Sequence, residues 1–411
     1  MAATILRTIV IFITLLGVAV AAPAQRRRAT QKKPPATTAA KAPASQQQAE
    51  FNKLAKQADA AREAGRLEDA IRLYNQALQL NPKWVEGWWY LGSIFYDRDR
   101  YGEAREALRN LLSNDAKNGA AWALIGLCEF QLRNYDPALA DIQYARVLGM
   151  GDNKEFINVT RYHAGILMTR SGQFELGYEA LREFAREGNE SPNVIEALGL
   201  NILRMPFLPT EAPPDKRELI LLAGRAAFNQ AARRVQDTER AFKELLARYP
   251  DAPNVHYAYG VFLLTDLPDA ALDEFRRELQ VSPANVPAML QIAFEYIKRN
   301  DFENAKPYAQ QAVEAAPNLF ATHNALGRVL LELGKIDEAI KELETGVKQA
   351  PDSPEMRFAL ARAYARAGRK EDAARERSTF LELDKQKRTE RSGPQSVGGI
   401  NTKPTDKNPP R

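Results

Sequence analysis

Apolar residues recur with a helical period along most of the chain, and the clearest example is the stretch from Val85 to Asn118. One face of a helix is formed by positions i, i+3, i+4 and i+7, which here are Trp88, Leu91, Gly92 and Phe95. A second apolar run with the same period follows almost at once, from Tyr101. The stretch therefore predicts two consecutive helices joined by a short turn.

Prolines indicate that this pattern repeats at a fixed length. Four of those in the second half of the chain, at positions 250, 283, 317 and 351, are spaced at intervals of 33, 34 and 34 residues. Proline lacks an amide donor and disfavours a helical residue before it, so each one ends a helix at the same phase. Aligning the chain by this phase predicts about nine to ten helix pairs between Phe51 and Lys387.

Small residues then fall into two columns of the alignment. The first helix carries a pair that usually ends in Gly or Ala: Leu91-Gly92, Ile125-Gly126, Ala164-Gly165, Leu198-Gly199, Tyr259-Gly260, Ile292-Ala293, Leu326-Gly327 and Leu360-Ala361. The second helix carries Ala70, Ala104, Ala138, Gly177, Ala271, Ala305, Ala339 and Ala373. Two helices that cross closely leave no room beyond a methyl group, so both columns must stay small. Gly65, Gly172, Gly334 and Gly368 mark the turn inside the unit.

The spacing W-x2-L-G-x2-F, followed by an Ala twelve residues after the Leu-Gly pair, resembles the tetratricopeptide repeat, a helix-turn-helix unit of 34 residues. This resemblance implies an all-α, right-handed superhelical solenoid. It also implies a non-enzymatic scaffold that binds an extended peptide or a helix of a partner protein. The runner-up function is a structural or self-associating component of a larger assembly, and self-association stays open on the sequence alone.

In this family the first helices line a concave face through their second, fifth, ninth and twelfth residues. Carried onto this chain, those positions predict a peptide-binding groove made of Trp89, Tyr96, Phe130, Tyr162, Tyr257, Phe294, Arg328, Phe358 and Arg362. Glu86 and Asn324 fall among them. Each aromatic residue has an alternative role in packing against the neighbouring helix. The Lys and Asn set with which some family members hold two carboxylates is missing here, so we expect apolar and aromatic anchors.

Prolines also interrupt the repeats. Four of them lie between residues 204 and 215, where they exclude a regular helix. The sequence thus predicts a repeat array over 51–203, an interrupting loop over 204–215 and a second array over 216–387, with the fifth repeat lacking its second helix. Either the loop is a tolerated deletion that re-aims the solenoid, or it is a hinge or a partner contact.

The two ends differ from the repeats. Residues 1–24 combine Arg7, an apolar run from Ile9 to Val20 and the small-x-small site Ala22-Pro23-Ala24, which predicts a cleaved signal peptide and a periplasmic or secreted protein. Basic residues just beyond the run favour the alternative, an uncleaved membrane anchor. Residues 25–50 and 388–411 are polar and basic, and we expect both to be disordered.

Charge and reactive side chains add little chemistry. Net charge is +5, but residues 51–384 hold 43 basic and 49 acidic residues, which argues against a specific nucleic-acid surface on the repeats. The single cysteine, Cys128, lies in an apolar run and is expected to be a buried small residue. His256 and His323 occupy the column of Trp88 and Trp122, as packed rings. We therefore predict no catalytic residue, cofactor or metal site.

Overall fold

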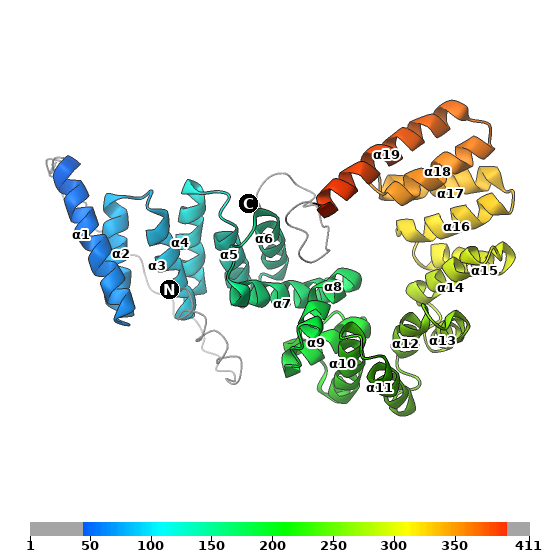
Figure 1. Cartoon of the computed structure of the whole chain (residues 1–411), viewed down its shortest axis with the longest axis horizontal. Helices are drawn as coiled ribbons and strands as arrows, with labels where there is room; N and C mark the ends of the chain where they lie inside the picture. The colour runs from blue at the N-terminus through cyan, green and yellow to red at the C-terminus, as the bar shows by residue number, and fades with distance from the viewer. Residues whose placement is uncertain (1–43, 393–411) are drawn as a thin grey trace, which may run out of the picture. The chain divides into compact units, whose positions relative to one another are not determined.

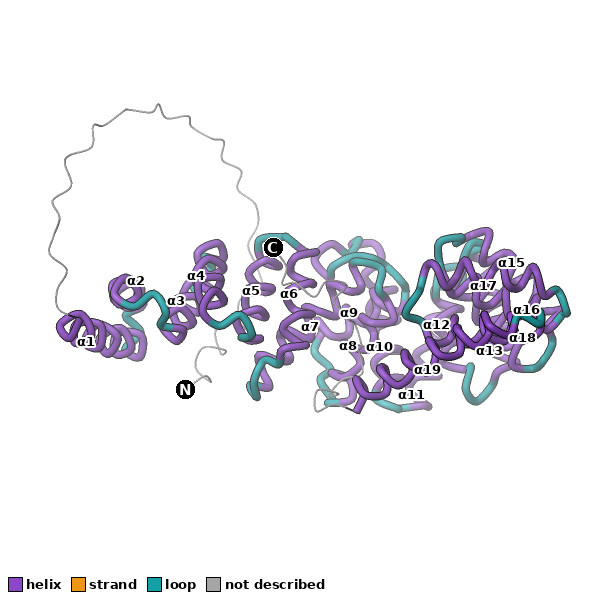
Figure 2. Tube along the Cα trace, turned by 90° about the horizontal axis from the view of Figure 1, so that it is seen from above, coloured by secondary structure: helices purple, strands orange, loops and turns teal. Residues whose placement is uncertain are grey.

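The computed structural model describes residues 44–392, and within that range every regular element is a helix (Figures 1 and 2). The predicted signal peptide lies outside the described residues. The described part falls into two compact units, residues 44–163 and residues 164–392, and the boundary lies inside helix α7. The all-α repeat solenoid predicted from the sequence is confirmed.

The first unit contains three helix pairs and most of a seventh helix. The bounds are α1 Ala44–Glu63, α2 Leu67–Leu80, α3 Val85–Asp97, α4 Tyr101–Asn114, α5 Gly119–Gln131, α6 Tyr135–Leu148 and α7 Lys154–Arg170. Helices α1, α3 and α5 are the first of their pairs, and each packs on the even-numbered helix that follows it.

The second unit continues with twelve helices and two short 3₁₀ turns within the described residues. The bounds are α8 Phe174–Arg186, α9 Pro192–Ile202, η1 Pro209–Glu211, η2 Pro214–Lys216, α10 Arg217–Ala231, α11 Val235–Arg248, α12 Val255–Leu263, α13 Pro268–Val281, α14 Val286–Lys298, α15 Phe302–Ala315, α16 Phe320–Glu332, α17 Ile336–Gln349, α18 Pro354–Arg366 and α19 Lys370–Ser392. From α10 onward the even-numbered helix is the first of each pair, and α14 to α19 stack pair after pair in Figure 1.

The two small-residue columns meet where the helices of a pair cross. Ala104 and Ala339 are fully buried on the second helices. A Cβ atom on Gly92 would lie 2.8 Å from Cγ of Leu108, and one on Gly327 would lie 2.5 Å from Cγ of Leu343. The same leucine, four residues after the column alanine, therefore fills the space above the glycine in both pairs.

The turn inside most pairs contains one residue with positive φ, and that residue is not always glycine. Gly65, Gly172, Gly334 and Gly368 take φ values between 72° and 78°, as predicted. Where the sequence has no glycine, Asp99, Arg133, Arg233 and Asn300 take φ values between 57° and 63°. The strain of a left-handed residue is small enough for the repeat packing to impose it.

Helix α9 has no second helix of its own, and α10 packs on it directly. A Cβ atom on Gly199 would lie 1.9 Å from the carbonyl oxygen of Ile220, and one on Gly224 would lie 1.9 Å from the carbonyl oxygen of Ile195. The reciprocal contacts show two antiparallel helices whose backbones touch. Because α10 also packs on α11, this one helix belongs to two pairs.

The proline-rich segment after α9 is packed against the second unit. Leu208 is 1% exposed, and Met205 and Phe207 contact the core formed by α9 to α12. Glu211 accepts hydrogen bonds from the backbone amide of Leu208 and from Arg170. These contacts occupy the space next to α9 and α10 with ordered side chains.

Both outer boundaries of the helical region differ from the sequence prediction. Helix α1 begins at Ala44, inside the segment 25–50 expected to be disordered, because Ala, Gln and Glu are good helix formers and Gln47 donates to the carbonyl oxygen of Leu80. Helix α19 runs to Ser392, past the expected end at 387. Its Lys387 forms an ion pair with Glu355, and Gly393-Pro394 follows the helix in the sequence.

Candidate functional site

The first helices α14, α16 and α18 lie side by side in the second unit. Three residues predicted for the groove follow one another across them. The guanidinium of Arg328 on α16 lies 6.0 Å from the ring centre of Phe294 on α14, and Arg362 on α18 is close enough to lower the pKa of Arg328. Phe358, one turn before Arg362, is 49% exposed and packs its ring on Phe380. We call these three helices' shared surface, defined by Phe294, Arg328, Phe358 and Arg362, the first-helix face.

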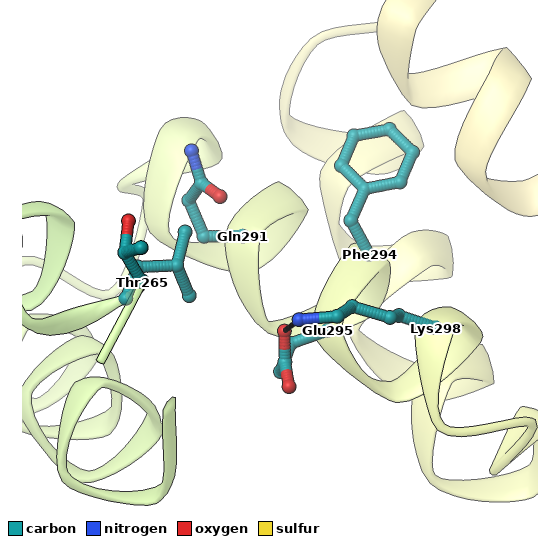
Figure 3. A pocket seen from close by; sticks show the side chains of 6 residues that line it. Thr265, Gln291, Phe294, Glu295 and Lys298 are labelled. Carbon is teal, nitrogen blue, oxygen red and sulfur yellow. Dashed lines mark hydrogen bonds and ion pairs between the residues drawn. The ribbon is translucent and has the colours of Figure 1, made fainter. Parts of the chain in front are cut away.

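A pocket of about 400 Å³ opens beside Phe294 (Figure 3). It lies between the end of α12 and one side of α14, and its lining residues are Leu264, Thr265, Gln291, Phe294, Glu295 and Lys298. Figure 3 shows the ring of Phe294 pointing away from the paired side chains of Glu295 and Lys298. The pocket thus has an aromatic wall and an ionic wall. Of its lining residues, the sequence pattern singled out only Phe294.

Charges on the first-helix face are unevenly paired. Glu332 accepts from Arg362 at 2.6 Å and from Arg366 at 3.0 Å, so both of its oxygens are occupied by arginines. Arg328 is partly buried, and among the described residues no carboxylate forms an ion pair with it. Burial, reinforced by the like charge of Arg362, lowers the pKa of Arg328. The face therefore carries excess positive charge at a partly desolvated arginine.

A neutral polar group lies one turn before Arg328 on the same side of α16. The side-chain oxygen of Asn324 is buried, and it has no hydrogen-bond partner within the described part of the chain. A buried acceptor without a donor costs free energy, so this oxygen is locally unfavourable within α16. Asn324 was one of the polar residues noted at the groove positions of the sequence.

Tyr257 lies at the other end of this unit and is more enclosed than predicted. Its ring packs on Phe275 at 5.9 Å, and Arg204 lies 5.8 Å from its centre. Burial raises the pKa of Tyr257. Arg204 also stacks on Phe174 and forms an ion pair with Glu175. Tyr257 therefore holds the end of α9 to α12, and little of its ring is available to a ligand.

The four groove residues predicted in the first unit are also mostly enclosed. Tyr96 is only 7% exposed and packs on Tyr101, and burial raises its pKa. Phe130 and Tyr162 are partly buried and pack edge-on against His163. Trp89 is partly buried. Tyr96 is thus a packing residue, which is the alternative that the pattern left open.

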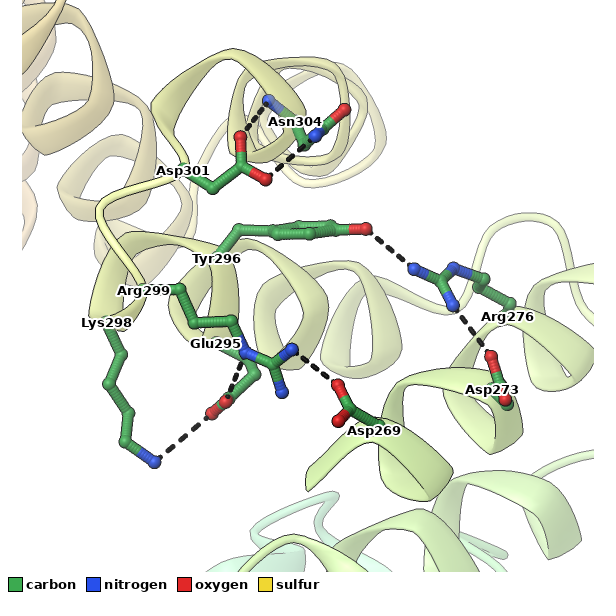
Figure 4. Close-up of polar contacts among 9 residues, drawn as sticks. All are labelled: Asp269, Asp273, Arg276, Glu295, Tyr296, Lys298, Arg299, Asp301 and Asn304. Atoms are coloured by element: carbon green, nitrogen blue, oxygen red, sulfur yellow. Dashed lines mark hydrogen bonds and ion pairs between the residues drawn. The ribbon is translucent and has the colours of Figure 1, made fainter. Parts of the chain in front are cut away.

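A polar network joins α13 to α14, and its Glu295 and Lys298 also line the pocket (Figure 4). Arg299 bridges Glu295 on its own helix at 2.8 Å and Asp269 on α13 at 2.5 Å. On the same two helices, Arg276 donates to the hydroxyl of Tyr296 at 2.6 Å. Glu295, which is 6% exposed, therefore has its charge balanced, and α14 is held in place where it presents Phe294.

The column of Trp88 and Trp122 has a role that the sequence did not indicate. Side chains at this position donate to the carbonyl oxygen six residues earlier: Trp88 to Pro82 at 2.8 Å, Trp122 to Ala116 at 3.0 Å and Arg357 to Pro351 at 3.0 Å. Each of these residues therefore ties the loop between two repeats to the following helix.

Two histidines take the same position and add a carboxylate. His256 lies 2.9 Å from the carbonyl oxygen of Pro250 through Nε2 and 2.6 Å from Glu274 through Nδ1. His323 makes the equivalent contacts with Pro317 at 2.8 Å and Glu342 at 2.7 Å. The hydrogen bond to Glu274 raises the pKa of His256. Both histidines are buried, as predicted, but they are hydrogen-bonded bridges rather than packed rings.

Buried acids form a separate cluster in the first unit. Glu129 is 3% exposed and accepts from Asn134 at 2.7 Å, and Arg105 and Arg109 lie at 3.2 and 3.5 Å. Asp141 is 5% exposed, and burial together with the charge of Glu129 raises its pKa to about 7.

The remaining reactive groups are enclosed or scattered. Cys128 is fully buried, and burial raises the pKa of its thiol to about 12, so the thiolate is strongly disfavoured. Within residues 44–392 the acids, histidines and cysteine form no group that could hold a metal ion. None of the helices in that range is long and apolar enough to span a bilayer.

Comparison with known sequences decides the family. Two profiles of the tetratricopeptide repeat match, one over residues 55–118, 91–153 and 324–376, and the other over residues 286–319. The chain is a tetratricopeptide repeat protein. The matches cover repeats in both compact units, including α14 and α16 of the first-helix face.

Relatives of this tetratricopeptide repeat chain are distant. It is 24% identical over 267 residues to the human protein O-mannosyl-transferase TMTC3. The matched region covers 62% of this chain and 28% of that protein. It is 25% identical over 126 residues to the general transcriptional corepressor trfA of Dictyostelium discoideum. The matched region covers 31% of this chain and 9% of that protein. The chain therefore spans less than a third of the length of either relative.

Solved structures resemble parts of the chain. MamA from Desulfovibrio magneticus RS-1 is 19% identical with a TM-score of 0.38, and the match covers 41% of this chain and 96% of MamA. YrrB, described as a tetratricopeptide repeat protein with an unusual peptide-binding site, is 19% identical with a TM-score of 0.35, over 38% of this chain and 82% of YrrB.

Proposed function

We propose that this tetratricopeptide repeat protein is a non-enzymatic scaffold that binds an extended segment of a partner protein on the first-helix face. The family supports an interaction scaffold as the general role. The proposal for the binding surface rests on one observation: α14, α16 and α18 together present an aromatic pocket wall, partly buried arginine and an exposed phenylalanine. Such a combination of aromatic residues and arginine is typical of residues that dominate binding energy at interfaces.

Phe294 packs against the core of the C-terminal helices and Phe358 packs on Phe380, but neither side chain is fully enclosed. Phe358 leaves about half of its surface in solvent, and Phe294 forms the wall of an open pocket. A residue that served only packing would gain more by being enclosed, as Phe275 is on α13 at 0% exposure. The helices underneath are held by their own contacts, so the face is preorganised for a ligand, which lowers the entropic cost of binding.

The location that we propose is the cell envelope. It rests on the signal-like residues 1–24, which lie outside the described part of the structure. Mass spectrometry of the mature N-terminus tests it. A new N-terminus at Gln25 in an exported fraction is the expected result, and a chain that keeps Met1 to Ala24 would contradict cleavage.

Binding can be tested without knowing the partner. A library of random peptides displayed on phage is selected against the immobilised full-length chain, and enriched peptides are measured against variants. We expect Phe294→Ala and Phe358→Ala to weaken binding about tenfold or more, since aromatic anchors are common hot spots. Val235→Ala, at a residue 60% exposed on α11, is the matched control and should bind as the wild type does.

Two outcomes would overturn the proposal. Either no peptide is enriched over a blank surface, or the enriched peptides bind Phe294→Ala and Phe358→Ala as tightly as they bind the wild type. Circular dichroism of each variant confirms that a loss of binding is not a loss of fold.

A further inference from the structure

His256 differs from the tryptophans and the arginine in its column because its charge depends on pH. We propose that this histidine is a proton-dependent link between two repeats: its charged imidazole holds the loop between α11 and α12, and loss of the proton releases that loop. The loop joins the pair α10 and α11 to the pair α12 and α13, so the proton controls how firmly the two repeats are connected. The inference goes beyond the proposed binding function and does not depend on it.

The ring of His256 lies between two hydrogen-bond acceptors. Its Nδ1 is 2.6 Å from a carboxylate oxygen of Glu274 on α13, and its Nε2 is 2.9 Å from the backbone carbonyl oxygen of Pro250 in the loop. A neutral imidazole has one N–H, whereas the protonated ring has two. Both contacts are therefore hydrogen bonds only when each ring nitrogen carries a proton. After deprotonation, one ring nitrogen turns a lone pair toward an acceptor.

The same position in other repeats shows what the link requires. Trp122 donates to the loop carbonyl at 3.0 Å through an N–H that does not titrate. Arg357 makes both contacts of His256, because it donates to the carbonyl oxygen of Pro351 at 3.0 Å and to Glu376 at 2.8 Å. Arginine stays charged in proteins, so that repeat has a permanent cation at this position. Histidine alone among these residue types changes its charge between about pH 5 and 8.

A second histidine has the same geometry with one addition. His323 lies 2.7 Å from Glu342 and 2.8 Å from the carbonyl oxygen of Pro317. Gln349 also donates to that carbonyl oxygen, at 2.8 Å. This loop therefore keeps a neutral donor at every pH, and for this reason the proposal concerns His256.

The charges around His256 favour the protonated ring. Glu274 also forms an ion pair with Arg277, so the shared proton lies on the ring rather than on the carboxylate. The buried carboxylate of Glu278 on α13 adds a second negative charge nearby. Asp251 of the loop lines a pocket of about 380 Å³ together with the ring. Three acids therefore face the imidazole against one arginine, and the pocket gives water a path to it.

The neighbouring helix α11 contributes a balanced pair. Its Glu239 and Lys243 form an ion pair at 2.6 Å near Tyr259, one turn after His256 on α12. The hydrogen bond to Glu274 raises the pKa of His256, although burial opposes the increase. The link is therefore complete below about pH 6.5, the value of histidine in an unfolded chain, and is lost as pH rises past the folded value.

Nuclear magnetic resonance of the full chain tests the protonation. The chain contains 3 histidines, so isotopic labelling of histidine alone gives few ring signals, and substitution assigns each of them. At about pH 6.5, where half of free histidine is neutral, both ring nitrogens of His256 should be protonated and hydrogen-bonded. A ring with a single N–H at that pH would overturn the inference.

A fluorescent probe tests the loop. Cys128 is fully buried, so a cysteine introduced at an exposed residue is the accessible thiol. A dye on Asp251→Cys reports on the loop held by His256, and a dye on Lys117→Cys reports on the loop held by Trp122 as the matched control. As pH rises from about 5.5 to 9, the anisotropy at the first position should fall with the midpoint of the His256 titration, and the anisotropy at the second should stay constant.

A permanent cation should remove the response. His256→Arg copies Arg357, so the probe on Asp251→Cys should keep its high anisotropy at every pH in this variant. Equal falls for the two probes, or an undiminished fall in His256→Arg, would contradict the proposed link. If His256→Arg does not fold, the comparison of the two probes in chains that retain His256 still decides the question.

Discussion

The contact between α9 and α10 gives the most demanding prediction. In Gly199→Ala the new Cβ atom would lie 1.9 Å from the backbone oxygen of Ile220, so the two helices must move apart by more than 1 Å before the distance reaches even 3.0 Å. No side chain can turn away to relieve the contact. Overpacking of this kind costs about 3 kcal/mol, and the better helix propensity of alanine returns up to about 1, which leaves a loss of about 2 kcal/mol.

Gly102→Ala is the matched control for helix propensity. A Cβ atom there would have nothing within 4 Å, and the residue lies in the first turn of α4. This variant should be neutral or more stable by up to about 1 kcal/mol. Urea unfolding followed by circular dichroism compares the two variants with the wild type, and amide hydrogen exchange shows whether the loss is confined to α9 and α10.

A second variant tests whether one close approach explains both glycines. Gly224→Ala should cost as much as Gly199→Ala, because its Cβ atom meets the carbonyl oxygen of Ile195 at the same 1.9 Å. The double variant should cost less than the sum, since one separation of the helices relieves both contacts. Wild-type stability in Gly199→Ala, or strict additivity, would refute the reasoning.

Three further predictions concern buried charge. Burial raises the pKa of Asp141 to about 7, so its contribution to the free energy of unfolding becomes unfavourable above about pH 4 and grows more so as pH rises to about 7. Asp141→Asn should remove this loss and gain stability relative to the wild type between about pH 4 and 7, and a difference that does not change with pH would contradict the prediction. The pKa of His256 is raised by its bond to Glu274, so its contribution is complete below about pH 6.5 and is lost as pH rises past the folded value; an NMR titration that gives a value at or below 6.5 would refute this. Glu129→Ala should lower the free energy of unfolding, measured in urea, by about 3 kcal/mol. This is near the lower end for a broken buried ion pair, because Arg109 is already half exposed. A loss below about 1 kcal/mol would show that water solvates both arginines in the variant and would contradict the prediction.

The repeat pattern was readable from the sequence because it depends on local spacing. Gly92 and Ala104 had to be small wherever two adjacent helices cross, and the structure places both at such a crossing. The role of Gly224 was not readable in this way. It lies off the small-residue column, and its need for space appears only once α10 takes the place of the helix that α9 lacks.

The binding surface was predictable in outline but not in its charge balance. Position within the repeat singled out Phe294 and Arg328, and the structure brings these two together. Glu332 forms ion pairs with Arg362 and Arg366 of α18 and none with Arg328, four residues before it on α16, and this choice depends on contacts between helices that no local pattern contains. Tyr96 shows the opposite case, because its enclosure depends on Tyr101 across the turn.

Helix α10 belongs to two pairs, and this affects the N-to-C direction in which a bound peptide would run along the first helices. Gly199 faces Ile220 and Gly224 faces Ile195, so α9 and α10 run in opposite directions although both are first helices by sequence. A peptide has a polarity, from its N-terminus to its C-terminus, and side chains on oppositely directed helices match opposite polarities. A single peptide cannot make equivalent contacts on both sides of this crossing. The direction of the first helices is therefore reversed once within the second unit, between α9 and α10.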